Sequence, residues 1–260
     1  MDDIIYKIES IVRQCGHMML SVYSNLDIEE KEGTGNLVTK YDKLIQNRLK
    51  EELLKLIPTA SFFGEEGKED NKILDNGYTF IVDPIDGTFN FTRDMKLSAI
   101  SVAMLKDGIP YISVCYNPYI NEMYLAQKDK GAYLNYKKII VSNKKLASGL
   151  LLFGSSPYNK ELHNKSFKVL NNIGKEALDI RRSGSAVIDL CNIASGKAEI
   201  YFELTLSPWD YAGGYLLVTE AGGKVTDIYG NNIKFDKPCS ILATNNKEDY
   251  LKYFNEDSLS

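Results

Sequence analysis

The sequence predicts a mixed α/β protein with a strand-rich first half, and three patterns in its 260 residues support this. Near the N-terminus, apolar residues recur at intervals of three and four, which is the period of a helix. Between residues 97 and 141, short apolar runs alternate with turn signals, as antiparallel strands do. Beyond residue 149, strand-like and helix-like segments alternate. The chain is therefore expected to combine two leading helices, a sheet of consecutive strands and a mixed α/β portion.

The composition argues against several classes of protein. The net charge is −4 and the pI about 5.4, without a basic cluster, so nucleic-acid binding is not expected as a main role. No apolar run approaches the ~20 residues of a membrane span, and the start Met1–Asp3 lacks signal-peptide features. We therefore expect a cytoplasmic protein that does not act at a membrane. Four scattered cysteines favour buried thiols in a reducing compartment over a zinc site: Cys15, Cys115, Cys191 and Cys239.

Two amphipathic helices are predicted at the start of the chain. The first covers residues 3–24. The second follows Thr39, a residue suited to capping, and Pro58 closes the segment. Asp42 lies in its first turn, where a negative charge is favoured, so it has a complete structural explanation as a helix-start residue.

A buried strand is predicted over Thr79–Val82, because this run is apolar and β-branched. Pro84 restricts the residue before it to an extended conformation. The strand is therefore expected to end at Asp83, with Asp86 just beyond it in a turn. The following pair, Gly87–Thr88, combines a permissive glycine with a helix start whose free amides suit an anion.

The remaining elements follow from periodicity and turn residues. Four runs form the expected meander: 97–105, 111–116, 122–126 and 132–141. The second half is expected to contain strands at 149–154, 177–181, 224–228 and 240–243, and one from residue 200 that ends in a loop before Pro208. Helices are expected at 160–171, 185–195, 208–221 and 248–254. In the helix at 160–171, Leu162, Phe167 and Leu170 are expected to face inward.

The candidate chemistry is carried by carboxylates. Asp83 and Asp86 offer hard oxygen ligands beside an anion-binding turn, which predicts a Mg²⁺ site that receives a phosphate. As an alternative, Asp-Pro and Asp-Gly pairs are common turn formers that do no chemistry. Glu65 and Glu66 are either additional ligands or charges of a solvated turn. Asp210, near a predicted helix start, is by default a dipole-compensating residue.

These motifs together resemble the inositol monophosphatase family, whose members are Mg²⁺-dependent, lithium-sensitive phosphomonoesterases. The resemblance is carried by Gly64-Glu65-Glu66, by Asp83-Pro84-Ile85-Asp86-Gly87-Thr88-Phe89-Asn90-Phe91 and by Trp209-Asp210-Tyr211-Ala212-Gly213-Gly214. It implies the sugar-phosphatase fold, an α+β and α/β layered sandwich in the order α-β-α-β-α. It also implies one domain over residues 1–260, with a strand-rich α+β lobe at about 1–145 and an α/β lobe at about 146–260, in a homodimer.

The resemblance assigns the metal ligands. Glu65 and Asp83, with the carbonyl of Ile85, would hold a first Mg²⁺. Asp83, Asp86 and Asp210 would hold a second, and Glu65 would also contribute to a third, weaker ion. The crowding of these carboxylates agrees with this reading, because like charges in one cavity are costly unless cations bind.

The resemblance also assigns catalytic and supporting residues. Thr88 with Asp42 would orient and deprotonate the attacking water, beside the catalytic carboxylate of Glu65. The amides of Gly87 and Thr88 would hold the phosphate, together with the region of Asp86 and Asp210. Two further residues would support the site without being strong ligands: Glu66 and Lys31.

The resemblance is compatible with several substrates. Glu203, with the backbone of Gly184 and Ala186, occupies positions that favour a polyol monophosphate such as myo-inositol 1-phosphate. Relatives with a similar core act on fructose 1,6-bisphosphate, 3′-phosphoadenosine 5′-phosphate, histidinol phosphate or NADP. Arg181 and Arg182 could serve a second phosphate, which keeps the bisphosphatase alternative open. A metal-binding interaction protein that kept the fold is the non-enzyme alternative.

Overall fold

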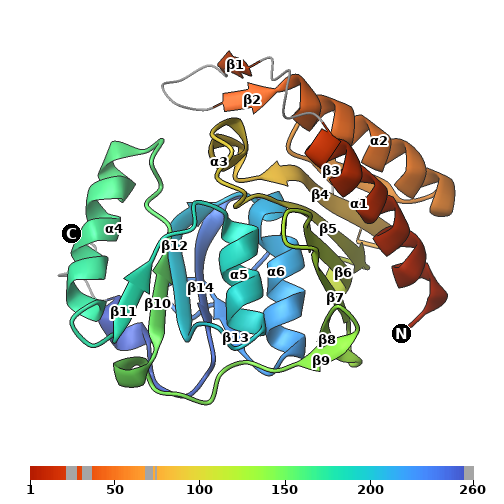
Figure 1. Cartoon of the computed structure of the whole chain (residues 1–260). Helices are drawn as coiled ribbons and strands as arrows, with labels where there is room; N and C mark the ends of the chain where they lie inside the picture. The colour runs from red at the N-terminus through yellow and green to blue at the C-terminus, as the bar shows by residue number, and fades with distance from the viewer. Residues whose placement is uncertain (22–27, 31–36, 68–72, 74, 255–260) are drawn as a thin grey trace.

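Helices and β-sheets alternate in five layers in the order α-β-α-β-α (Figure 1). The computed structural model describes residues 1–21, 28–30, 37–67, 73 and 75–254, and for 28–30 and 37–39 it describes the backbone. Two outer helices cover a seven-stranded sheet, two helices fill the middle, and one helix covers a five-stranded sheet. The layered sandwich predicted for this sequence is confirmed.

The seven-stranded sheet has the order β3-β4-β5-β6-β7-β8-β9. Its strands are β3 (Ser61–Gly64), β4 (Tyr78–Asp86), β5 (Ala99–Lys106), β6 (Ile109–Asn117), β7 (Glu122–Gln127), β8 (Gly131–Leu134) and β9 (Lys137–Ile139). Only β3 and β4 pair in parallel, so the predicted antiparallel meander is confirmed. The run predicted as one strand over 132–141 is a hairpin instead, because Asn135 and Tyr136 both take positive φ, as its tight turn requires.

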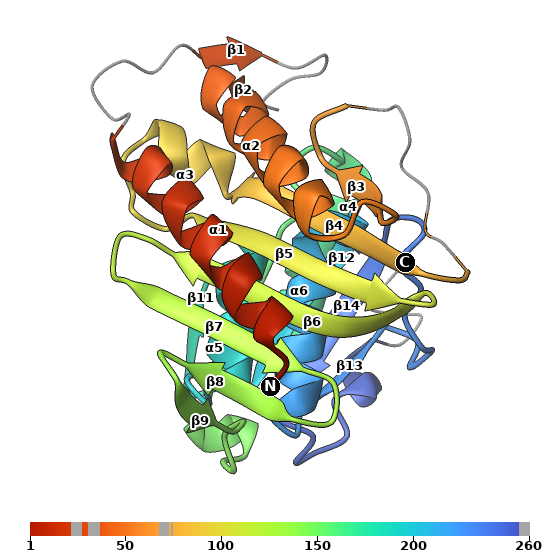
Figure 2. The same cartoon turned by 90° about the vertical axis from the view of Figure 1, so that its right-hand side faces the viewer.

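Helices α1 (Asp3–Ser21) and α2 (Lys40–Leu56) pack side by side on the outer face of this sheet (Figure 2). Their apolar stripes meet residues of the central strands in one core cluster, for example Ile8 and Leu49 with Val102. Between the two helices, β1 (Ile28–Glu30) and β2 (Leu37–Thr39) pair antiparallel. The segment before α2, expected to lead directly into the helix, is thus a strand.

The five-stranded sheet has the order β11-β10-β12-β14-β13. Its strands are β10 (Leu150–Phe153), β11 (Asp179–Arg181), β12 (Ile200–Leu206), β13 (Lys224–Thr226) and β14 (Cys239–Thr244). Strand β10 is parallel to both neighbours, and β14 is antiparallel to both of its own. Short 3₁₀ turns, η1 (Leu146–Ser148) and η2 (Leu251–Tyr253), lie outside it, and η2 replaces the predicted terminal helix.

Helix α4 (Lys160–Ile173) covers the outer face of this second sheet. Its buried side chains are Ser166, Val169 and Ile173, which follow a helical period. The prediction that Phe167 faces inward is wrong, since its side chain is 46% exposed. It instead contacts the rings of Phe153 and His163 at the edge of the layer.

Helices α5 (Ala186–Ala194) and α6 (Pro208–Glu220) form the middle layer and contact both sheets. Two glycines of α6 allow this close packing. A Cβ atom at Gly214 would lie 2.4 Å from Leu190 of α5, and one at Gly213 would lie 2.5 Å from the hydroxyl of Ser101 on β5. The same two helices carry residues of the candidate site at their N-termini.

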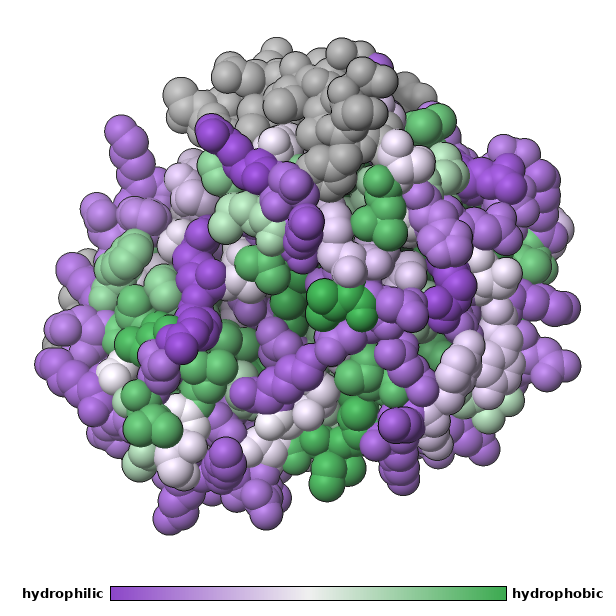
Figure 3. Space-filling model, in the orientation of Figure 1, coloured by the Kyte–Doolittle hydropathy of each residue, from purple (hydrophilic) through white to green (hydrophobic). Residues whose placement is uncertain are grey.

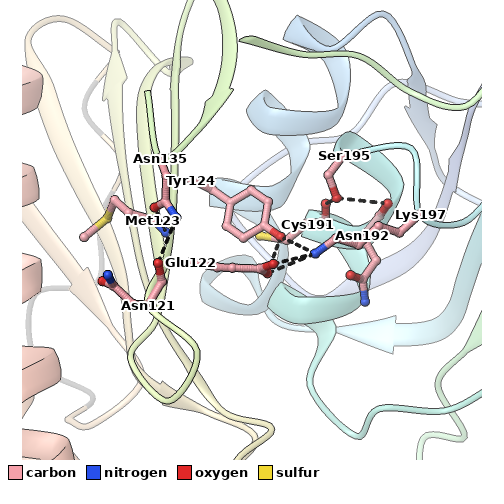
Figure 4. A network of polar contacts seen from close by, with 9 residues as sticks. All are labelled: Asn121, Glu122, Met123, Tyr124, Asn135, Cys191, Asn192, Ser195 and Lys197. Atoms are coloured by element: carbon pink, nitrogen blue, oxygen red, sulfur yellow. Dashed lines mark hydrogen bonds and ion pairs between the residues drawn. The ribbon is translucent and has the colours of Figure 1, made fainter. Parts of the chain in front are cut away.

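A polar network fastens the C-terminal end of α5 to the large sheet (Figure 4). The ammonium group of Lys197 bonds both carboxylate oxygens of Glu122, at 2.8 and 3.0 Å, and the hydroxyl of Tyr124 at 3.1 Å. Ser195 Oγ donates to the carbonyl of Cys191 and thereby closes the helix. The middle layer is therefore held at the end opposite to the candidate site.

The molecular surface is largely hydrophilic on the face that Figure 3 displays, with smaller apolar patches between the polar residues. Among the residues that the structure describes, no helix has the length and apolar character to cross a membrane. The four cysteines are free thiols. Three of them are buried, as expected, and Cys239 is partly exposed.

Candidate active site

Three carboxylates from two distant segments meet in the middle of the molecule. Asp83 and Asp86 lie on β4, and Asp210 lies in the first turn of α6. Each offers an oxygen atom within 4.8 Å of the other two. Asp83 and Asp86 are buried and Asp210 is half-buried. The structure thus brings together residues that are more than a hundred positions apart in the sequence.

Strand β4 continues to Asp86, so the prediction that it ends at Asp83 is wrong. Asp83 pairs with Ser101 and Asp86 pairs with Ala99, which leaves one extra residue on β4. Such a bulge changes the alternation of side chains, and residues three apart can then face the same side. Pro84 fits here because it has no N–H for the ladder. The bulge therefore explains how both carboxylates reach one cluster.

The turn after β4 is fixed by glycine and by hydrogen bonds. Gly87 has a φ of 81°, and a Cβ there would lie 2.9 Å from the carbonyl oxygen of Leu97. Its own carbonyl accepts from the hydroxyl of Ser98 at 2.9 Å. Asn90, in the short helix α3 (Thr88–Thr92), donates to the carbonyls of Leu97 and Ser183 at 2.7 and 2.9 Å. These bonds tie the turn to the loop that precedes α5.

The hydroxyl of Thr88 lies close to Asp42 at the edge of this cluster. Thr88 Oγ1 is 3.1 Å from Asp42 Oδ1 and 3.0 Å from the carbonyl oxygen of Ile85. Asp42 lies in the first turn of α2, as the sequence indicated, and the structure shows that it is buried. A carboxylate of the outer-layer helix α2 thus reaches the edge of the cluster.

The N-termini of α5 and α6 hold two of the three carboxylates. Ser185, the N-cap of α5, donates its hydroxyl to Asp86 Oδ2, and the amide of Val187 donates to the same atom at 2.9 Å. Asp210 Oδ2 accepts from the amide of Ser207 at 2.7 Å in a capping box. The helix-start role expected for Asp210 is therefore real, and it also fixes the position of its carboxylate.

The carboxylate cluster is electrostatically unfavourable on its own. Burial and the charges of Glu65, Asp86 and Asp210 raise the pKa of Asp83 well above its ordinary value. Burial and the charges of Asp86 and Glu65 do the same to the pKa of Asp210. Burial also raises the pKa of Asp86 to about 6. Hard oxygen donors crowded in this way fit a divalent cation such as Mg²⁺, which favours their ionised form.

The two glutamates of the predicted ligand pair differ in position. Glu65 lines the same cavity as Asp83 and lies outside the group of three within 4.8 Å. The backbone of Glu66 is bonded to the side chain of Gln46, with its amide donating to Gln46 Oε1 at 2.8 Å. Lys31, the remaining supporting residue of the prediction, lies outside the described residues.

A cavity of about 450 Å³ opens beside the cluster. The predicted substrate residues that line it are Asp86, Gly87, Thr88, Gly184, Ala186, Glu203 and Asp210. Arg182 also lines this cavity. Arg181 is exposed and pairs with Asp179 at 2.6 Å, so the two arginines are not equivalent.

The carboxylate of Glu203 is held on one wall of the cavity. It accepts from the amide of Ser156 at 3.0 Å and from the hydroxyl of Tyr201 at 2.9 Å. A Cβ atom at Gly154 would lie 1.9 Å from Glu203 Oε2, so any larger residue there would have to displace this carboxylate. Burial raises the pKa of Glu203.

Several residues of the site were missed at the level of sequence. Ser185 could have been found as an N-cap residue, but nothing in the sequence links its hydroxyl to Asp86. Gly154, just after β10, lies against Glu203 of β12, a contact that depends on the sheet order, whereas Tyr201 bonds Glu203 from two positions earlier on the same strand. Asp189 of α5 also lines the cavity and has no local sequence signal.

Comparison with known proteins agrees with the fold and the motifs. The model of the "Inositol monophosphatase family" matches residues 1–258. An "Inositol-1-monophosphatase" of Rhizobium meliloti (strain 1021) is 36% identical over 223 residues, covering 85% of this chain and 81% of the relative. A "Nus factor SuhB" of Xylella fastidiosa is 33% identical over 245 residues, covering 90% of this chain and 87% of the relative.

Solved structures give the same result. An inositol monophosphatase of Thermotoga maritima matches with a TM-score of 0.89 at 28% identity, over 100% of both chains. The extragenic suppressor protein suhB of Bartonella henselae matches with a TM-score of 0.88 at 30% identity, over 100% of this chain and 99% of that chain. The chain described here belongs to the inositol monophosphatase family, a family of metal-dependent phosphatases that act on small phosphorylated substrates.

Proposed function

We propose that this protein is a Mg²⁺-dependent phosphomonoesterase that hydrolyses a polyol monophosphate, with myo-inositol 1-phosphate as the first candidate substrate. The observation that carries the proposal is the group of Asp83, Asp86 and Asp210, two of them buried and one half-buried, with oxygens within 4.8 Å of one another, at the wall of a cavity. The relatives named inositol-1-monophosphatase support the choice of substrate.

The residues proposed to hold Mg²⁺ are Glu65, Asp83, the carbonyl of Ile85, Asp86 and Asp210, for two ions and a third weaker one. When bound, Mg²⁺ would neutralise the cluster, acidify a water and stabilise the leaving oxygen. The chain itself fixes the geometry of these ligands, through the bulge in β4 and the N-termini of α5 and α6. Glu66 supports the adjacent turn through its backbone bonds to Gln46.

Thr88 and Asp42 are proposed to position the attacking water. Because the Thr88 hydroxyl is within donation distance of Asp42 Oδ1, its lone pairs remain available to accept from a water in the cavity. Asp42 can then take a proton through this hydroxyl. The amides of Gly87 and Thr88, both of which line the cavity, are proposed to hold the phosphate. No side chain is required as a covalent nucleophile.

Glu203 is proposed to accept hydrogen bonds from hydroxyl groups of the polyol, and the backbone of Gly184 and Ala186 forms the adjoining wall. A second candidate function is the hydrolysis of a bisphosphate such as fructose 1,6-bisphosphate, or of 3′-phosphoadenosine 5′-phosphate. The presence of Arg182 at the cavity favours this candidate, since a guanidinium binds phosphate oxygens well.

Phosphate release from these esters, measured with and without Mg²⁺ and with Li⁺ added, tests the proposal. We expect Mg²⁺-dependent turnover with a preference for myo-inositol 1-phosphate and inhibition by Li⁺. Asp210→Asn should lose most of this activity and remain folded. An Arg182→Gln variant tests the bisphosphate candidate, with Arg181→Gln as the matched control. Of these two arginines, only Arg182 lines the cavity, so only its loss should reduce activity on a bisphosphate.

A preference for fructose 1,6-bisphosphate that Arg182→Gln removes would replace the first candidate by the second. Failure to release phosphate from any ester would instead favour a metal-binding interaction protein, a reading that the relatives named "Nus factor SuhB" keep open. We also propose that the protein is cytoplasmic and forms a homodimer. Sedimentation of the purified protein tests the dimer.

A further inference from the structure

Asn90 carries a buried amide that the proposed mechanism does not use. It lies in α3 at the wall of the cavity and is 4% exposed. Its Nδ2 atom donates to the carbonyl oxygens of Leu97 at 2.7 Å and Ser183 at 2.9 Å. Because carbonyl oxygens only accept hydrogen bonds, these two neighbours fix the amide with its nitrogen toward them. Both donor protons of Asn90 are thus used within the chain, and the amide acts on other parts of the protein.

The two bonds join segments that are far apart in the sequence. Leu97 lies between α3 and β5, whereas Ser183 lies in the loop before α5, 93 positions beyond Asn90. Within that loop, Ser183 Oγ donates to the carbonyl of Ser185 at 2.9 Å and accepts from its amide at 3.0 Å. The loop is therefore a locally bonded turn, and the bond from Asn90 fastens it to the region of α3.

Two glycines of the cavity wall pack against the Asn90 amide. A Cβ atom at Gly184 would lie 3.1 Å from Asn90 Nδ2, and one at Gly87 would lie 3.4 Å from the same atom. Gly87 belongs to the turn proposed to hold the phosphate, and Gly184 belongs to the wall proposed to face the polyol. The amide of Asn90 therefore lies between the two parts of the cavity that would bind the two ends of the ester.

The phosphate turn has hydrogen bonds that do not involve the Asn90 side chain. The carbonyl of Gly87 accepts from the amide of Phe91 at 3.0 Å and from the hydroxyl of Ser98 at 2.9 Å. The hydroxyl of Thr88 donates to the carbonyl of Ile85 at 3.0 Å. This turn is therefore expected to keep its shape when the Asn90 amide is removed.

The position of Gly184 depends more directly on Asn90. On one side of Gly184, the hydroxyl of Ser185 donates to Asp86. On the other side, the carbonyl of Ser183 accepts from Asn90. Removal of the Asn90 amide would leave the first bond alone, so Gly184 could shift relative to the phosphate turn.

We propose that Asn90 is a positioning residue for substrate recognition, which holds the Gly184 wall at the distance from the phosphate turn that a polyol phosphate spans. This inference rests on the proposed phosphatase function and deepens it. The amide acts on the alcohol end of the ester, through the backbone of Gly184 and Ala186. It is consequently expected to affect binding of the polyol and not the chemical step.

The test compares myo-inositol 1-phosphate with cyclohexyl phosphate, which has the same ring without hydroxyls, at saturating Mg²⁺. For Asn90→Ala and Asn90→Leu, we expect KM for the inositol ester to rise about fivefold or more, as for a lost hydrogen bond between wall and substrate. KM for the cyclohexyl ester should stay nearly unchanged, and kcat should change little for both esters.

Asn245→Ala is the matched control. Asn245 is also a buried asparagine, its amide donates to the carbonyl of Lys144 at 2.8 Å, and it does not line the cavity. This variant should lower Tm and leave KM unchanged for both esters, because it removes a comparable bond elsewhere in the fold.

Gly184→Ala perturbs the same contact without removing the Asn90 side chain. Its methyl group would press against the Asn90 amide, and its positive φ of 83° adds strain, so the loop should move away from the phosphate turn. We expect the same rise in KM for the inositol ester alone. This variant tests the inference even if the Asn90 variants fail to fold.

A lower Tm with equal changes in KM for both esters would overturn the inference and leave Asn90 with a structural role. An unchanged KM for the inositol ester in the folded variants would do the same. If the wild-type protein hydrolyses neither ester, the proposed function itself fails, and the inference fails with it.

Discussion

Replacing Asp86 by asparagine should have opposite effects on folding stability without metal and on phosphatase activity. Burial raises the pKa of Asp86 from 3.8 to about 6. A carboxyl with a higher pKa in the folded protein binds more protons there, so stability falls as the pH rises through this range. The difference between 3.8 and about 6 corresponds to about 3 kcal/mol at higher pH without a bound cation.

The asparagine amide keeps an oxygen for the amide of Val187 and cannot ionise. In EDTA at about pH 7.5, we expect Asp86→Asn to be more stable than the wild type by about 1–3 kcal/mol, which is several degrees in Tm. At about pH 4 the difference should vanish, because the wild-type carboxyl is then protonated when folded and half protonated when unfolded. Added Mg²⁺ should stabilise the wild type more than the variant, and the variant should lose its phosphatase activity.

Thermal unfolding followed by circular dichroism at both pH values measures this. Asp94→Asn is a suitable control, since Asp94 is exposed and asparagine tolerates its positive φ of 54°. A variant that is less stable than the wild type in EDTA at pH 7.5 would refute the reasoning. So would an offset that is the same at both pH values.

Three further predictions concern single contacts. Thr88→Val removes the hydroxyl near Asp42, and kcat should fall by about 10²-fold or more with an unchanged melting curve; a normal kcat would exclude a role in activating water. Gly154→Ala places a methyl group against Glu203 and should raise KM for a polyol phosphate more than for cyclohexyl phosphate, whereas equal effects would argue against a substrate role for this wall. Lys197→Met breaks a half-exposed ion pair far from the cavity, and unfolding should show a loss of about 1 kcal/mol or less with normal activity.

The fold was largely predictable because its signals are local. Helical period identified α1 and α2, and the turn pairs between apolar runs identified the antiparallel meander. The errors arose where the pattern of apolar residues did not show a local feature of the backbone or the direction of a helix face. Residues 132–141 look like one strand, but Asn135 and Tyr136 adopt positive φ and form a hairpin. Phe167 is apolar, yet the core-facing side of α4 is set by Ser166, Val169 and Ile173.

The candidate site was predictable only in part. Asp83, Asp86 and Asp210 were named from motifs, and the structure brings them together. The sequence did not reveal the bulge in β4, because an extra residue is defined by the register with β5. It also did not reveal the bond from the Ser156 amide to Glu203 or the position of Asp189 at the cavity, since both depend on which strands and helices lie side by side. The roles of these residues in catalysis stay predictions.

The position of the carboxylate cluster has a mechanical consequence. Asp83 and Asp86 belong to the large sheet, whereas Asp210 lies in the first turn of a helix that packs on both sheets. The N-terminus of α5, from the second half of the chain, is hydrogen-bonded to Asp86. A cation bound among these residues would act as a crosslink between the two halves of the molecule. A shift of one half relative to the other would move the ligands apart. The affinity for the cation would therefore depend on the relative position of the two halves.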